Sequence, residues 1–118
     1  MPKNKLAQIA VSALEDIKAR DITVLDVRKL TSLADTFVIA SADSNRQAKA
    51  LAHHVRDLLK ASGAPIIGVE GEEGGEWVLV DAGDIVVHVM QPAVRAYYNL
   101  EELWTARPAR RTRVATAA

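Results

Sequence analysis

Apolar positions near the N-terminus recur with the period of a helix. Over Leu6–Ile17 they lie three and four residues apart, with Lys and Glu side chains on the opposite face. A run of β-branched residues follows at Ile22–Val27, and Thr36–Ala42 is apolar at almost every position. The second run is typical of a strand that is buried on both faces. This part of the chain therefore predicts a helix and two strands, with a connection at Lys29–Asp35.

Ser44 precedes the clearest helical pattern. Gln47 stands three residues later, so the two residues match a capping box, in which each side chain bonds the other residue's backbone amide. Gly63 fits the position after a helix C-terminus, and Pro65 prevents continuation. The apolar stripe between these signals consists of Ala48, Leu51, Ala52, Val55, Leu58 and Leu59.

The remaining chain predicts three short strands and a last helix. Ile66–Val69 is a short strand, and Trp77–Ala82 and Ile85–Met90 form a hairpin around Gly83. Pro92 begins the last helix. The order α-β-β-α-β-β-β-α predicts one mixed α/β domain, with a roughly five-stranded mixed sheet flanked by helices.

The hairpin has two different faces. Because side chains alternate along a strand, a loop with an even number of residues places Val80 opposite Ile85 and Trp77 opposite His88. One face is then aliphatic and comprises Val78, Val80, Ile85, Val87 and Val89. The other face is mixed and comprises Trp77, Leu79, Val86, His88 and Met90. We expect the aliphatic face to be core; the mixed face is either covered by the last helix or exposed as an interface. A three-residue loop would reverse the assignment.

Composition adds an uneven distribution of charge. The 118 residues are 49% hydrophobic and 25% charged, which is typical of one globular domain. Residues 1–60 carry a net charge of +3, residues 61–106 carry −7 and residues 107–118 carry +4. The acidic part should attract a basic partner. We expect a domain at 1–106 and a basic, flexible tail at 107–118, which either dangles or contacts phosphates.

Several classes of protein are disfavoured. There is no cysteine and no apolar run of the roughly 20 residues that a membrane helix needs. Glu15 and Asp16 interrupt any secretory signal, so we expect a cytoplasmic protein with no membrane contact.

No set of residues suggests catalysis. His53 and His54 are adjacent on a helix and therefore point in different directions. The glycines of the polar loop at 71–76 are surrounded by glutamates, which disfavours phosphate binding. No strand carries two carboxylates at positions i and i+2 that would share a metal ion. We expect no enzyme, no metal, no cofactor and no small-molecule substrate.

Several stretches together resemble the ribosomal silencing factor family, also called Iojap-like. The matching stretches occur in the family's order over most of the chain, from Asp21 to Trp104. They are Asp21–Val27 (DITVLDV), Ala34–Ala40 (ADTFVIA), Ser44–Ala48 (SNRQA), Glu70–Gly71, Gly75–Val80 (GEWVLV), Gly83–Val89 (GDIVVHV) and Tyr98–Trp104 (YNLEELW). The chain lacks an acid that the family commonly has at Ala93 or Val94, which affects pairing around Arg95.

The resemblance implies a nucleotidyltransferase-like fold without its catalytic motif. It implies binding to the large ribosomal subunit through the protein numbered fourteen, which blocks joining of the small subunit and represses translation when nutrients are scarce. Free members often form homodimers. Organelle relatives act in large-subunit assembly, so an assembly factor is one alternative and a residual nucleotidyltransferase is another.

The resemblance also implies a partner-binding surface on the hairpin and the last segment. Its candidate residues are Trp77, Asp81, His88, Tyr98, Leu100, Glu101 and Trp104. Leu100 and Trp104 are equally compatible with a role in the core. Trp77 and Tyr98 are the preferred anchors, because their rings combine apolar area with a polar group. The arginine-rich tail would add a weak contact to ribosomal RNA.

Overall fold

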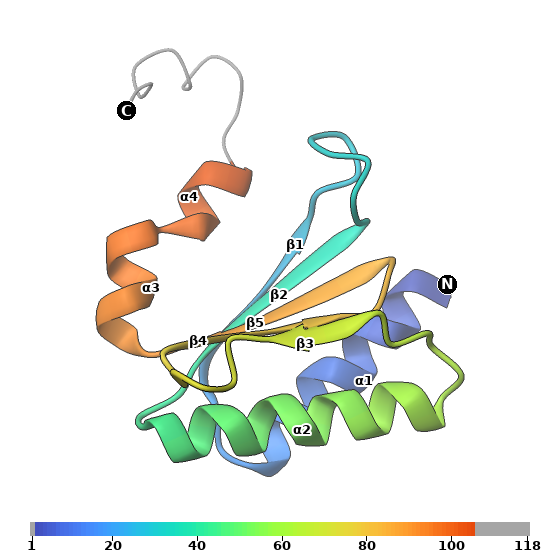
Figure 1. The fold of residues 1–118 in the computed structure, drawn as a ribbon. Coiled ribbons are helices and arrows are strands. Elements are labelled where there is room, and N and C mark those ends of the chain that lie inside the picture. Colours follow the sequence, from blue (N-terminus) through green and yellow to red (C-terminus); the bar gives the residue numbers. More distant parts are fainter. Residues whose placement is uncertain (1, 106–118) are drawn as a thin grey trace.

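The computed structural model describes residues 2–105, so the predicted tail at 107–118 lies outside the described residues. The elements are α1 (Pro2–Asp16), β1 (Arg20–Asp26), β2 (Thr36–Ser41), α2 (Asn45–Ala61), β3 (Gly68–Glu70), β4 (Trp77–Asp81), β5 (Ile85–Met90), α3 (Pro92–Tyr98) and α4 (Leu100–Thr105) (Figure 1). No helix among these residues is long and apolar enough to cross a membrane.

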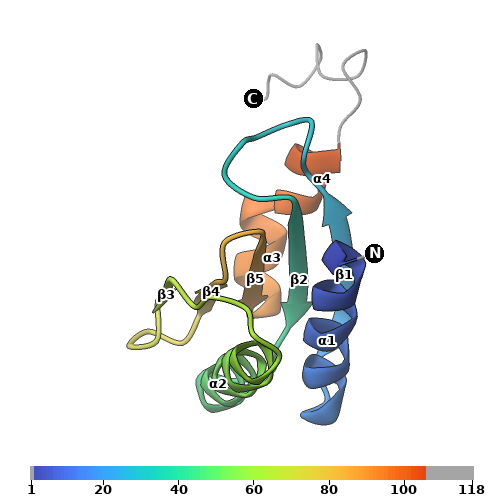
Figure 2. The ribbon, with the colours of Figure 1, turned by 90° about the vertical axis from the view of Figure 1, so that its right-hand side faces the viewer.

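The five strands form one mixed sheet in the order β1-β2-β5-β4-β3. β2 and β5 are parallel, and the other neighbouring pairs are antiparallel. Helices α1 and α2 lie side by side on one face of the sheet (Figure 2). The α3–α4 segment lies on the other side, beyond one end of the sheet's β5 strand (Figure 1). The predicted five-stranded mixed sheet flanked by helices is confirmed.

The two sheet faces carry separate cores. The core beneath α1 and α2 contains the aliphatic face of the hairpin, as predicted, together with Leu14, Leu51, Val55 and Leu59 from the two helices. The core on the other face is smaller and contains Leu25, Val27, Ala34, Phe37, Ile39, Val86 and Met90. Trp77 and Leu79 pack against this second core and remain half-buried.

The predicted hairpin register is wrong by two residues. Val80 pairs with Val87 rather than Ile85, and Trp77 pairs with Met90 rather than His88. Ala82 N donates to Ile85 O at 2.9 Å, which closes the tight turn. A shift of two residues preserves the faces, because side chains alternate with period two. The aliphatic and mixed faces are therefore as predicted.

Helix α2 has the predicted ends with one difference. Ser44 Oγ accepts from Gln47 N at 3.0 Å, and Gly63 follows the helix with φ +99°. Gln47 does not return a bond to Ser44 N. Its Oε1 accepts from Asp43 N at 2.6 Å, and its Nε2 donates to Ile17 O at 3.1 Å, which ties the start of α2 to the end of α1.

The predicted single last helix is wrong as well, since two short helices take its place. Asn99 adopts a left-handed conformation with φ +48° and separates α3 from α4. Its N–H donates to Arg95 O at 2.8 Å. A left-handed residue ends an α-helix and redirects the chain, so α4 leaves α3 at an angle (Figure 1).

We predict that Gly71→Ala destabilises the protein by more than about 1 kcal/mol. Gly71 has φ +86°, and a Cβ there would lie 2.1 Å from the carbonyl oxygen of Trp77. Gly74→Ala in the same loop is the matched control, because a Cβ at Gly74 meets nothing within 4 Å. Urea denaturation measures both; equal stabilities of the two variants would contradict the prediction.

Candidate partner-binding site

Trp77 connects the second core to the surface. It is the first residue of β4, and its Nε1–H donates to Nδ1 of His88 at 3.1 Å. His88 lies on the neighbouring strand β5 and is only 5% exposed. Since Nδ1 accepts a hydrogen bond from the indole N–H, a neutral His88 carries its own proton on Nε2. Nε2 is buried and has no hydrogen-bond partner among the described residues.

Burial keeps the imidazole of His88 uncharged. Desolvation disfavours the imidazolium form and lowers the pKa of His88 to about 4. At neutral pH the side chain therefore acts as a hydrogen-bond acceptor for Trp77. It does not present a positive charge to a partner.

Five aromatic and imidazole rings form a row from this core to the surface. The ring centroids of Phe37 and His88 are 4.9 Å apart, and those of Trp77 and Tyr98 are also 4.9 Å apart. The Tyr97 ring meets that of Tyr98 edge-on at 5.0 Å. Tyr98 is 52% exposed and Tyr97 is 81% exposed. We call Trp77, Tyr98 and Tyr97 the aromatic surface, because they form the accessible end of the row.

The corner between α3 and α4 is fixed beside the aromatic surface. Arg95 on α3 donates to Glu101 on α4, with 2.7 Å between Nη2 and Oε2. These hydrogen bonds lower the pKa of Glu101 below its ordinary value. Val94 and Leu100 pack against the second core at the same corner. The corner therefore combines apolar contacts with one ion pair.

The structure brings four of the seven predicted site residues together: Trp77, Tyr98, Leu100 and Glu101. Leu100 is half-buried against the second core, which is the alternative that the sequence left open for it. His88 supports Trp77 from beneath and reaches no surface.

Asp81 lies at the other end of β4, on the same face as Trp77 but four residues away. Its Oδ1 accepts from Gly83 N at 3.0 Å, so it stabilises the hairpin turn. Trp104 belongs to α4, and its side chain lies outside the described residues.

Acidic side chains occur in and beside the segments that carry the aromatic surface. Glu76 precedes Trp77 and is exposed, and Glu102 is exposed on α4. Glu70 pairs with Leu79 and therefore projects from the same face as Trp77. In residues 61–105 the only Lys or Arg is Arg95, which is bonded to Glu101. This surface is therefore suited to a partner with exposed cations.

Sequence reasoning left two residues out of the candidate site: Tyr97, which belongs to the aromatic surface, and Arg95. Arg95 entered the sequence analysis only because an acid that the family commonly has nearby is missing, yet its side chain is 11% exposed. Its hydrogen-bond partners include Ser41 and Thr23, which are 54 and 72 residues earlier in the chain. The only available signal was that Arg95 is the sole basic residue in an acidic segment.

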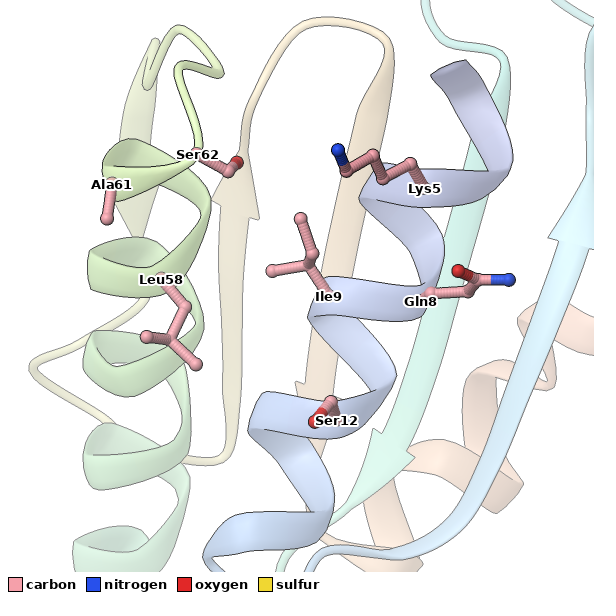
Figure 3. Close-up of a pocket in the computed structure, with 7 residues that line it drawn as sticks. All are labelled: Lys5, Gln8, Ile9, Ser12, Leu58, Ala61 and Ser62. Atoms are coloured by element: carbon pink, nitrogen blue, oxygen red, sulfur yellow. The ribbon is translucent and has the colours of Figure 1, made fainter. Parts of the chain in front are cut away.

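The opposite side of the molecule has a groove of a different kind. It runs between α1 and α2, and Ile9 and Leu58 face each other across it (Figure 3). Its other lining residues are Lys5, Gln8, Ser12, Ala61 and Ser62. Within the described part of the chain, no three His, Asp or Glu side chains come together as metal ligands would.

We predict that His88→Phe removes a pH-dependent part of the stability. The pKa of His88 is about 4 in the folded protein, against 6.5 for an unperturbed histidine, so the unfolded state binds more protons between these limits. Stability from this group is complete above about pH 6.5 and is lost as the pH falls through about 4. Urea unfolding from pH 4.5 to 7.5 should show a shallower rise with pH in the variant. An unchanged slope would contradict the prediction; His54→Phe on α2, which replaces a histidine outside both cores that contacts Asp16, is the control.

Comparison with known proteins identifies the family. Residues 1–117 match the family described as "Ribosomal silencing factor during starvation". The chain is 58% identical over 104 residues to the ribosomal silencing factor RsfS of Chromobacterium violaceum, covering 88% of this chain and 85% of that protein. A crystal structure of a protein from the same bacterium superimposes with a TM-score of 0.86 at 56% identity, covering 91% of this chain and 89% of the other.

A more distant relative has a different name. The mouse protein "Mitochondrial assembly of ribosomal large subunit protein 1" is 39% identical over 100 residues, which are 82% of this chain and 44% of the mouse protein. The match to the family over nearly the whole chain, and the agreement in fold with a close relative, lead to one conclusion. The chain belongs to the ribosomal silencing factor family.

Proposed function

We propose that this protein binds the large ribosomal subunit through its protein numbered fourteen and thereby prevents the small subunit from joining. Repression of translation under nutrient limitation follows from that block. The observation that carries the proposal is the aromatic surface, where Trp77, Tyr98 and Tyr97 are accessible beside exposed carboxylates. Buried aromatic anchors supply most of the affinity in many protein interfaces.

Charge favours a basic protein as the direct partner. The aromatic surface belongs to the acidic part of the chain, and its one arginine already pairs with Glu101. Complementary charge accelerates encounter and disfavours partners of like charge, such as an RNA backbone. We therefore place the main contact on the ribosomal protein. The arginine-rich tail is proposed to add a weak contact to ribosomal RNA, which would weaken with salt.

The proposed block is steric. Docking of two ribosomal subunits requires their joining faces to approach each other, and a folded domain held on one face prevents that approach. The mechanism needs occupancy and no chemical turnover, so the protein is proposed to act without enzymatic activity. We further propose a cytoplasmic location and a homodimer for the free protein.

Assembly of the large subunit is the second candidate function. It is favoured by the printed name of the mouse relative, which refers to mitochondrial assembly of the large subunit. Both functions would use the same surface. Cells depleted of the protein distinguish them, because immature large subunits accumulate in one case, whereas survival of starvation fails with normal subunits in the other.

The direct test of the proposal is subunit joining. Purified large and small subunits are mixed with the protein in saturating excess and separated on a gradient. We expect free subunits to accumulate at the expense of joined ribosomes, and the protein to sediment with large subunits only. Undiminished joining would overturn the proposal.

We predict that Tyr98→Ala weakens large-subunit binding by about 2 kcal/mol, as loss of an interface anchor does, which is roughly thirtyfold in Kd. Tyr98 is half-exposed at the end of α3, so its removal leaves both cores intact. Trp77→Ala should weaken binding at least as much.

The control is Val24→Ala, which removes a side chain of similar exposure (48%) on the face that carries α1. Co-sedimentation over a range of protein concentrations gives the Kd of each variant. Binding of Trp77→Ala and Tyr98→Ala at the strength of Val24→Ala would remove the aromatic surface from the interface.

A further inference from the structure

Helix α3 is attached to the sheet in an unusual way. It carries Tyr97 and Tyr98, yet none of its residues is buried. Its apolar support consists of Val94, which packs against the second core, and of the ring contact between Tyr98 and Trp77. The Arg95 side chain, in contrast, is only 11% exposed. A cation with a nearly buried side chain therefore makes part of the contact between this helix and the sheet.

The guanidinium of Arg95 joins three other elements. Nη1 donates to Ser41 Oγ on β2 at 2.8 Å, and Nη2 donates to Thr23 Oγ1 on β1 at 3.1 Å. Nη2 and Nε both donate to Glu101 Oε2 on α4, at 2.7 and 3.2 Å. A guanidinium is planar and directs its N–H groups in fixed directions, so these bonds determine the orientation of α3 as well as its distance from the sheet.

This anchor stands next to Tyr98. Residues three apart lie on the same side of a helix, with about 5–6 Å between their Cβ atoms, so Arg95 and Tyr98 face the sheet together. Ser41 and Trp77 both pair with Met90, from opposite sides of β5. Arg95 and Tyr98 thus hold α3 at two points along one transverse row of the sheet.

We propose that Arg95 is the positioning residue of the aromatic surface: its bonds to Thr23, Ser41 and Glu101 hold α3 so that Tyr98 stays against Trp77. The part of this inference that concerns ribosome binding rests on the proposed function. The part that concerns the arrangement of the rings can be tested in the free protein alone. Arg95 itself lies beneath the surface and supplies the partner with no contact.

The experiment compares Arg95→Met with Arg56→Met. Methionine keeps much of the arginine side chain's volume and removes its N–H donors. Arg56 lies on α2, on the other side of the sheet, where it pairs with Asp57, so its loss changes the net charge equally. The nuclear Overhauser effect between the Trp77 and Tyr98 rings reports their contact, and co-sedimentation with large subunits reports binding.

We expect Arg95→Met to lose the ring-to-ring effect and to bind about tenfold more weakly, while Arg56→Met matches the wild type. Glu101→Gln should weaken binding less, and adding it to Arg95→Met should cause little further loss, because the two residues act through one contact. If Arg95→Met does not fold, Thr23→Val and Ser41→Ala, which each remove one bond, decide the same question.

Two results would overturn the inference. Retained ring contact with full binding would show that Arg95 positions nothing, and retained ring contact with weak binding would make it a direct contact. Failure of the wild-type protein to bind large subunits would instead overturn the proposed function. The comparison of ring contacts in the free variants would still decide the role of Arg95.

Discussion

The hydrogen bond from the indole of Trp77 to the imidazole of His88 orients the ring on which the rest of the aromatic surface packs. His88 can accept this bond because burial lowers its pKa to about 4 and so keeps the imidazole uncharged at neutral pH. The arrangement leaves the Nε2–H of His88 without a partner among the described residues. A buried donor without a partner costs about 1–3 kcal/mol. An apolar side chain in place of His88 would have no unpaired donor and would avoid this cost. In return for the lost stability, the protein gains a fixed direction for the Trp77 ring.

The difference between the two faces of the sheet explains why such a bond is needed on one side only. Beneath α1 and α2 the core is aliphatic, and hydrophobic contact without direction is sufficient to hold the helices. The other face is covered only in part by α3 and α4, and α3 has no buried residue. There the positions of exposed rings depend on directional bonds made by His88 and Arg95. The acidic charge of the same part of the chain would add long-range attraction for the basic partner that we propose, before it contacts those rings.

Alternation and helix signals predicted most of the fold, because they depend on neighbours in the sequence. The cap at Ser44, the end of α2 at Gly63 and the two faces of the hairpin all have this local origin. Alternation fixes a face but not a register, so the pairing of Val80 was wrong by two residues while its face was right. The left-handed Asn99 carries no strong signal, and the helix after Pro92 was therefore not divided. The partners of Arg95 on β1 and β2 depend on tertiary structure that no local pattern encodes.

Fixed rings also suit the mode of action that we propose. A protein that works by occupying a surface is effective for as long as it stays bound, and affinity differences between related complexes arise mostly from dissociation rates. Ordering a mobile side chain at an interface costs about 0.5–1.5 kcal/mol, and side chains already held in the bound arrangement avoid that cost. Trp77 is held by His88, and Tyr98 by Trp77 and by the anchoring of α3 through Arg95. His88 and Arg95 therefore act on binding without contacting the partner, because they hold in advance the rings that we propose make the contact.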